Sequence, residues 1–206
     1  MINVADICTS THALGPGLRS AIWVQGCPIH CKGCIAPAWI PFTTAQLMTP
    51  EEAADRLLTN PMIEGITISG GEPTSQAIEL AKMIRIVRQR KELHIICFSG
   101  YTYEQLLKWP EEIGVKDLLS QIDLLIDGPY IQNLNQSTTF AGSSNQRQIT
   151  LSTRPVPAGD TWSQRKLEVH IRDGNVLTVG VPPKDWDKNL IDQILKKPPL
   201  PIKELI

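Results

Sequence analysis

Short apolar runs alternate with amphipathic stretches along the amino-terminal two thirds of the chain. Four of the apolar runs predict buried strands, at residues 18–26, 65–69, 93–98 and 122–126. Each run leads directly into a loop that contains glycine. The segments between the runs carry apolar residues at helical spacing, so we expect helices to connect the strands.

The predicted helices have recognisable starts. Thr49 suits an N-cap, Pro50 suits the first helical position, and Glu52 completes a capping box, so a helix should begin here. A second helix is predicted over about 75–90 and a short third helix over 103–109. Strands that alternate with helices are typical of right-handed βαβ units, which predicts an α/β fold with mostly parallel strands.

The glycine-containing loops are the first candidates for a functional site. In parallel α/β sheets, ligands bind at the carboxyl ends of the strands. We therefore expect the loops that follow the four strands to meet on one edge of the sheet. These loops begin with Gly26-Cys27, Ser69-Gly70-Gly71, Ser99-Gly100 and Asp127-Gly128.

The pattern weakens after about residue 150, where strands and helices no longer alternate. We expect residues 1–152 to form one domain and residues 153–206 to form a C-terminal extension. The extension is predicted to contain a β-hairpin with its turn at Asp173-Gly174, a short helix at about 188–196 and a proline-rich end at 198–201.

Composition excludes several classes of function. The 206 residues carry a net charge of −1 and no long run of lysine or arginine, which argues against nucleic acid or an anionic membrane as a partner. No apolar run approaches the roughly 18–20 residues that span a bilayer, and the first residues lack a signal-peptide pattern. We therefore expect a cytoplasmic protein.

Three of the five cysteines crowd into eight residues, as Cys27, Cys31 and Cys34. Such crowding in a reducing compartment indicates metal or redox chemistry rather than disulfides. Three thiolates could hold a four-iron cluster and leave one iron open, or they could form a closed zinc site with His30. His30 directly precedes Cys31, which makes it hard for both to reach one tetrahedral ion, and no second ligand pair follows. The spacing favours the cluster and leaves both interpretations open.

The two remaining cysteines stand alone. Cys97 lies in a predicted strand and should be a buried small apolar residue. Cys8 has no partner nearby in sequence. Two isolated cysteines are too few for a second cluster of the ferredoxin kind.

The stretch Ser69-Gly70-Gly71-Glu72-Pro73 is a second candidate for chemistry. A glycine pair at a strand end allows the backbone to approach a ligand closely, so this loop could hold an ammonium or amide group. Alone, the same stretch is better explained as a strand-to-helix turn with a capping acid; on the same sheet edge as three cysteines it becomes a candidate ligand contact.

Taken together, these motifs resemble the radical S-adenosylmethionine enzymes, and among them the activating proteins of anaerobic ribonucleotide reductase. The resemblance covers roughly residues 12–150 in the family's order. The matching stretches are Gly15-Pro16-Gly17-Leu18-Arg19, Trp23-Val24-Gln25-Gly26-Cys27 with Cys31 and Cys34, Ser69-Gly70-Gly71-Glu72-Pro73, Ser99-Gly100-Tyr101-Thr102, Asp127-Gly128-Pro129-Tyr130 and Gly142-Ser143-Ser144-Asn145-Gln146-Arg147.

The resemblance implies a fold, two cofactors and their ligands. The fold would be a partial (β/α) barrel, and a [4Fe–4S] cluster would be bound by Cys27, Cys31 and Cys34 with S-adenosylmethionine at its open iron. Ser69, Gly70, Gly71 and Glu72 would contact the methionyl ammonium, and Gly33 would lie near the adenine, a position where many superfamily members carry an aromatic residue. Ser99 and Asp127 are further cofactor candidates. No residue is assigned an acid–base role.

The implied reaction is the reductive cleavage of S-adenosylmethionine to a 5′-deoxyadenosyl radical, which would generate a glycyl radical on a partner such as anaerobic ribonucleotide reductase. The electron would come from a low-potential donor such as flavodoxin or ferredoxin. Because the extension after residue 153 is absent from the minimal activating protein, a different peptide or protein substrate is an alternative. A non-catalytic zinc or iron–sulfur interaction module is a third hypothesis, but it leaves the glycine-pair loop unexplained. The stretch Asn145-Gln146-Arg147 is either a solvated loop or a contact to cofactor or partner.

Overall fold

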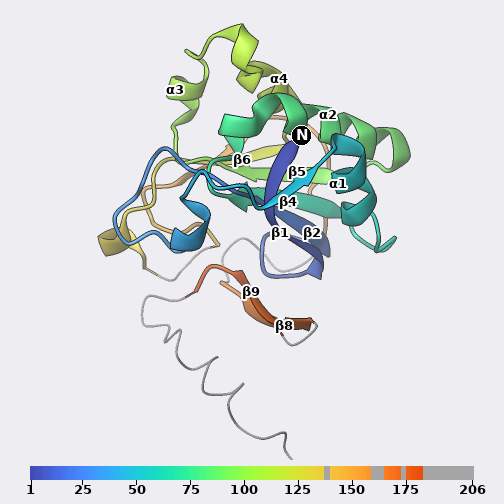
Figure 1. Cartoon of the computed structure of the whole chain (residues 1–206), viewed down its shortest axis with the longest axis horizontal. Helices are drawn as coiled ribbons and strands as arrows, with labels where there is room; N and C mark the ends of the chain where they lie inside the picture. Colours follow the sequence, from blue (N-terminus) through green and yellow to red (C-terminus); the bar gives the residue numbers. More distant parts are fainter. Residues whose placement is uncertain (137–139, 159–164, 173–174, 183–206) are drawn as a thin grey trace, which may run out of the picture.

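The computed structural model describes residues 1–136, 140–158, 165–172 and 175–182. A seven-stranded sheet with the order β3-β1-β2-β4-β5-β6-β7 forms its centre (Figure 1). Strands β2, β4, β5 and β6 are parallel, whereas β1, β3 and β7 pair antiparallel with their neighbours. The strands are β1 Ile2–Thr11, β2 Arg19–Val24, β3 Gln46–Met48, β4 Gly65–Gly70, β5 His94–Phe98, β6 Leu124–Asp127 and β7 Arg147–Thr150.

The predicted α/β fold with a mostly parallel sheet is therefore confirmed. The four predicted strands are β2, β4, β5 and β6. Both faces of these strands are covered, so their sequences are continuous apolar runs. The sheet is wider than predicted, because β1, β3 and β7 were not expected. These outer strands mix apolar and polar residues, as in the Asp6–Thr11 part of β1, and lack a periodic pattern.

Helices cover one face of the sheet (Figure 1). The first begins as predicted, since the Thr49 hydroxyl accepts a hydrogen bond from the Glu52 amide at 3.1 Å and the Glu52 carboxylate accepts one from the Thr49 amide at 2.7 Å. Helix α4 was not predicted. The α-helices are α1 Pro50–Leu57, α2 Ala77–Arg90, α3 Tyr103–Leu106 and α4 Val115–Gln121, and the 3₁₀ turns are η1 Pro37–Trp39, η2 Pro73–Gln76, η3 Glu111–Ile113 and η4 Gln132–Leu134.

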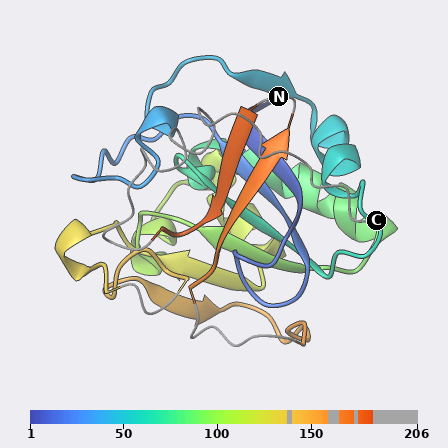
Figure 2. The ribbon, with the colours of Figure 1, turned by 90° about the horizontal axis from the view of Figure 1, so that it is seen from below.

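The opposite face of the sheet carries a second, smaller set of packed residues. Strands β8 (Leu167–Arg172) and β9 (Asn175–Gly180) form an antiparallel pair that lies across this face (Figure 2). Val179 of β9 is fully buried and belongs to one apolar cluster with Leu14, Trp23 and Cys8. The predicted turn at 173–174, the predicted helix at 188–196 and the proline-rich end lie outside the described residues. Within the described part of the chain, no helix has the length and apolar character that crossing a bilayer requires.

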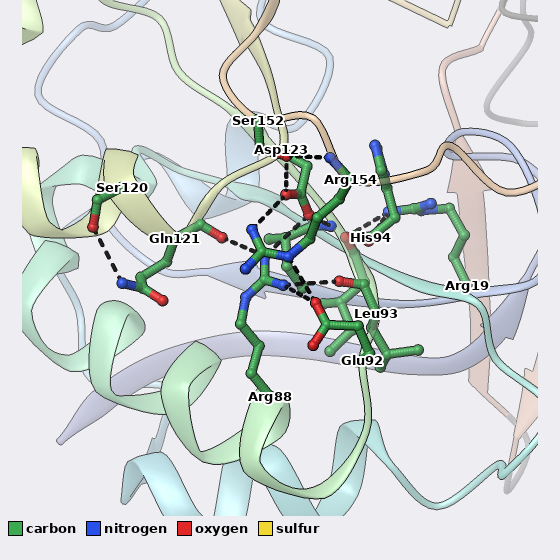
Figure 3. A network of polar contacts seen from close by, with 12 residues as sticks. Arg19, Arg88, Glu92, Leu93, His94, Ser120, Gln121, Asp123, Ser152 and Arg154 are labelled. Carbon is green, nitrogen blue, oxygen red and sulfur yellow. Dashed lines mark hydrogen bonds and ion pairs between the residues drawn. The ribbon is translucent and has the colours of Figure 1, made fainter.

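A buried polar network closes the amino-terminal ends of the parallel strands (Figure 3). The fully buried Arg19 donates hydrogen bonds to Thr67 Oγ1 at 2.8 Å and to the carbonyl oxygens of Ile66 and His94, both at 2.7 Å. Burial lowers the pKa of Arg19 to about 9, so the side chain stays charged at neutral pH. Nearby, Asp123 accepts hydrogen bonds from Arg88 at 3.0 Å and from the Ile95 amide at 2.7 Å. This network lies at the edge opposite the cysteine loop.

Candidate functional site

A cavity opens at the carboxyl ends of the parallel strands, where the sequence places its candidate residues. Its wall includes Cys27, Cys31 and Cys34 from the loop after β2. It also includes Ser69, Gly70, Gly71 and Glu72 after β4, and Ser99 and Gly100 after β5. Three of the four expected loops therefore contribute residues from their start to one cavity. The fourth contributes through Tyr130.

The cysteine loop is held in place by backbone hydrogen bonds to the segment that follows it. The amides of Gly26 and Cys27 donate to the carbonyl oxygens of Trp39 and Ile40, both at 2.9 Å. Gly26 has a φ of +99°, which a residue with a side chain rarely adopts, so the glycine lets the chain turn out of β2. The turn places all three thiols along the cavity, and none of them forms a disulfide.

The three thiols are donors of the kind that an iron–sulfur cluster requires. Burial raises the pKa of the Cys27 thiol, while hydrogen bonds from the backbone amides of Ile29 and His30 to the sulfur act in the opposite direction and favour the thiolate. His30 itself is exposed. Within the described residues, no group of three Cys, His, Asp or Glu side chains is arranged to hold one metal ion. A cluster would bind each thiolate at a different iron.

The glycine pair is explained by the close approach of two backbone segments. A Cβ atom at Gly70 or Gly71 would lie well under 3.0 Å from the backbone of Val24 or from the carbonyl oxygen of Gly26. In their present positions, the Gly71 amide donates to Val24 O at 2.7 Å and the Glu72 amide donates to Gly26 O at 2.9 Å. The loop after β4 is thus fixed directly against the start of the cysteine loop.

The Glu72 carboxylate is buried and joins the loops after β4 and β5. One oxygen accepts hydrogen bonds from the Thr74 amide at 3.0 Å, the Thr74 hydroxyl at 2.6 Å and the Ser99 hydroxyl at 3.0 Å. The other oxygen accepts from the Gly100 amide at 2.8 Å. Burial raises the pKa of Glu72, and these donors act in the opposite direction. Both oxygens therefore help to set the distance between two strand ends.

Two of the other cofactor candidates lie away from the cavity wall. Gly33 is exposed, and a Cβ there would collide with the side chain of Gln132. Asp127 is buried behind the wall, where it forms an ion pair with Arg147 and accepts a hydrogen bond from the Tyr103 amide at 2.7 Å. The structure thus brings Ser99 and the loop around residues 69–72 together with the cysteines, but it does not bring Gly33 or Asp127 into the wall.

The stretch Asn145-Gln146-Arg147 holds two loops together. The Gln146 side chain accepts a hydrogen bond from the Gly142 amide at 2.8 Å and donates one to the Gly128 carbonyl at 3.0 Å. The Asn145 side chain donates to the Pro129 carbonyl at 2.8 Å. Gln146 also lines the cavity. The sequence offered a solvated loop as one interpretation, and these bonds show instead a clamp on the loop that carries Tyr130.

Several cavity residues were not predicted from the sequence. Trp23 and Trp39 stack with ring centroids 5.6 Å apart and both line the cavity. Tyr130 and Val181 also line it. Val181 comes from a region with no recognisable motif, so no local signal in the sequence could have found it.

Comparisons with known proteins identify the family of this chain. Residues 13–149 match the family model described as a 4Fe-4S single cluster domain. The chain is 30% identical over 138 residues to the anaerobic ribonucleoside-triphosphate reductase-activating protein of Enterobacteria phage T4, which covers 65% of this chain and 84% of that protein. It is 32% identical over 144 residues to the protein of the same name from Escherichia coli strain K12, with 64% and 88% covered. The relationship that the motifs predicted is confirmed, and the chain belongs to the 4Fe-4S single cluster domain family.

Proposed function

We propose that this protein is a radical S-adenosylmethionine enzyme that generates a glycyl radical on a partner enzyme such as an anaerobic ribonucleotide reductase. One observation carries the proposal: the three cysteines of the motif share a single cavity with the glycine-pair loop and Ser99. The names of the relatives support the activating role. The parallel strands β2, β4, β5 and β6 would form part of a (β/α) barrel within a domain of residues 1–152.

In this proposal the cysteine thiolates bind a [4Fe–4S] cluster and leave its fourth iron open to S-adenosylmethionine. When bound and reduced by a flavodoxin or ferredoxin, the cluster would supply one-electron chemistry for the cleavage of S-adenosylmethionine to methionine and a 5′-deoxyadenosyl radical, and that radical would take a hydrogen atom from the substrate. The chain's own residues would bind and orient S-adenosylmethionine. Backbone groups of Ser69, Gly70 and Gly71 would hold the methionyl ammonium, with Glu72 and Ser99 fixing the loop that presents them.

The two candidates outside the wall keep proposed roles. Gly33 would leave room for the adenine only if the side chain of Gln132, now beside it, moves aside. Asp127 would act through Arg147, by holding the strand end that leads to Tyr130.

The cavity is suited to keep water away from a radical. Its wall is largely apolar, with Trp23, Trp39, Ile29, Ile35 and Phe98 beside the cysteines. Its empty volume is about 960 Å³, including the part open to solvent. Exclusion of water prevents side reactions of a reactive intermediate. We also propose a cytoplasmic location, without nucleic-acid or membrane partners.

A different peptide or protein substrate is a second candidate. It is favoured by one observation, that Gly180 and Val181 line the cavity although they lie outside the family match at residues 13–149. A zinc interaction module is disfavoured by the family's iron–sulfur description.

The test is anaerobic reconstitution with iron and sulfide, followed by reduction in the presence of S-adenosylmethionine. We expect cluster absorbance and 5′-deoxyadenosine, and a glycyl radical signal in electron paramagnetic resonance when the partner is added. Cys27→Ala, Cys31→Ala or Cys34→Ala should each abolish the cluster. Cys8→Ala and Cys97→Ala, at buried positions, are the matched controls and should retain it. Retention of zinc with no 5′-deoxyadenosine under any condition would refute the proposal.

A further inference from the structure

The antiparallel pair β8–β9 reaches the cavity from a part of the chain that the family match does not include. The match ends at residue 149. Gly180, the last residue of β9, and Val181 nevertheless form part of the cavity wall, together with Leu14 and Trp23. The region that follows the family domain therefore completes the site.

One side of the pair is attached to the end of β1. The Glu168 carboxylate of β8 accepts hydrogen bonds from the Thr11 hydroxyl at 2.7 Å and from the His12 amide at 2.8 Å. Beneath β9, Val179 is fully buried against the apolar cluster that contains Leu14 and Trp23. The hydrogen bonds orient the strand pair, and the burial of apolar surface stabilises its packing. Together they fix the pair on the sheet.

The other side is attached through Arg165, which precedes β8. Its guanidinium donates hydrogen bonds to the Ala141 carbonyl and to Asn135 Oδ1, both at 2.8 Å, and to the Pro182 carbonyl at 3.0 Å. Asn135 in turn donates to the Tyr130 hydroxyl at 3.2 Å. Arg165 thus ties the residue after Val181 to the loop that carries Tyr130, another residue of the cavity wall.

The close fit of β9 depends on glycine at position 180. Its φ is +116°, and a Cβ there would lie well under 3.0 Å from the Lys166 carbonyl and 3.1 Å from the Ala13 side chain. A larger residue would push the end of β9 away from the wall.

We infer that Gly180 and Val181 form a specificity-determining wall for the substrate, a polypeptide segment with glycine at the reacting position, and that Arg165 is the positioning residue for this wall. The inference rests on the proposed function. The residues assigned to cluster and S-adenosylmethionine come from the loops after β2, β4 and β5. Among its described residues, the extension adds to the wall a backbone and an aliphatic side chain, without thiol, hydroxyl or charge. Such a surface suits a peptide segment with a small side chain rather than the polar cofactor.

The test introduces Val181→Trp into the full chain and compares it with Ile171→Trp, a control at a position of β8 that is 69% exposed. The larger side chain would narrow the part of the cavity assigned to the substrate and displace the reacting carbon. We therefore expect glycyl radical formation on the partner to fall by about tenfold or more. Cluster content and 5′-deoxyadenosine formation without partner should stay at the wild-type level. Ile171→Trp should leave all three quantities unchanged.

Two further variants keep the inference testable if Val181→Trp fails to fold. Val181→Leu adds one methylene and should lower radical formation in the same direction. Arg165→Lys keeps the charge but cannot span Asn135 and Ala141, and should raise the ratio of 5′-deoxyadenosine to glycyl radical.

The outcomes distinguish a failure of the proposed function from a failure of the inference about Val181. If the wild-type chain forms no 5′-deoxyadenosine, the proposed function fails. If it does, but Val181→Trp and Val181→Leu transfer the radical at the wild-type rate, the wall does not face the substrate. If they lower 5′-deoxyadenosine and glycyl radical in parallel, Val181 faces the cofactor, and the inference is equally overturned.

Discussion

The buried His94 predicts a specific loss of stability in acid. His94 is 5% exposed at the start of β5 and lies close to the cationic Arg19 (Figure 3). Burial, followed by the charges of Arg19 and Arg88, lowers the pKa of His94 to about 4 from an ordinary value of 6.5, while Asp123 acts in the opposite direction. The folded protein therefore keeps this imidazole neutral at a pH where the unfolded chain protonates it.

The sign and size of the effect follow from linkage. Between pH 6.5 and 4 the unfolded state binds more protons than the folded state, so the stability contributed above pH 6.5 is lost as the pH falls toward 4. Each unit between the two pKa values corresponds to about 1.36 kcal/mol. At pH 4.5 we therefore expect His94 to lower the free energy of unfolding by roughly 2–3 kcal/mol relative to pH 7.

Urea unfolding followed by circular dichroism would measure this effect. His94→Leu removes the titrating group, so the free energy of unfolding of the wild type minus that of the variant should fall by roughly 2–3 kcal/mol from pH 7 to 4.5. The exposed His12 gives the matched control variant, His12→Leu. Each protein is measured at the same cluster content. Parallel pH profiles for the wild type and His94→Leu would show that the imidazole does not titrate as the structure requires.

Two other predictions concern buried polar groups. Gly65→Ala would place a Cβ within 2.6 Å or less of the Arg19 guanidinium, and displacing this buried charge should cost about 3–5 kcal/mol in urea unfolding. The same change in an Arg19→Met background should cost much less, and equal costs in the two backgrounds would contradict the steric argument. Glu72→Gln leaves a backbone amide facing another donor whichever way the side-chain amide is turned, so stability should fall by about 1–3 kcal/mol. The exposed Glu112→Gln is its control, and equal urea midpoints for the two variants would argue against the bonds assigned to Glu72.

The sequence predicted those parts of the fold whose signal is local. Strands β2, β4, β5 and β6 are covered on both faces, so each leaves an uninterrupted apolar run. The capping box at Thr49 marks a helix start within four residues. Strand β7 (Arg147–Thr150) has mostly exposed residues and is a strand because it pairs with β6, which no local pattern reveals. Helix α4 begins at a left-handed Gly114, and its few apolar positions form too short a pattern to recognise.

The residues of the candidate site likewise fall into those with a local sequence signal and those without one. Cys27, Cys31 and Cys34 could be found because metal ligands occur at close spacing, and the glycine pair because close backbone approach requires glycine. Tyr130 belongs to the loop after β6 that was expected at this edge, whereas Val181 reaches the cavity from a part of the chain far from every motif. The position of Val181 depends on tertiary packing, and a single sequence carries no direct record of it.

For two motif residues, a place in a family motif does not establish contact with a cofactor. Glu72 and Asp127 occur in stretches that match a cofactor-binding family, yet their carboxylates are buried and engaged by neighbouring donors. Loss of activity in a Glu72 variant would therefore be ambiguous, because the same substitution moves Gly100 away from the strand end that it shares with Ser99. A contact to the methionyl ammonium predicts weaker S-adenosylmethionine binding at unchanged stability. A clamp between strand ends predicts that binding and stability fall together, and the four hydrogen bonds to Glu72 favour the clamp.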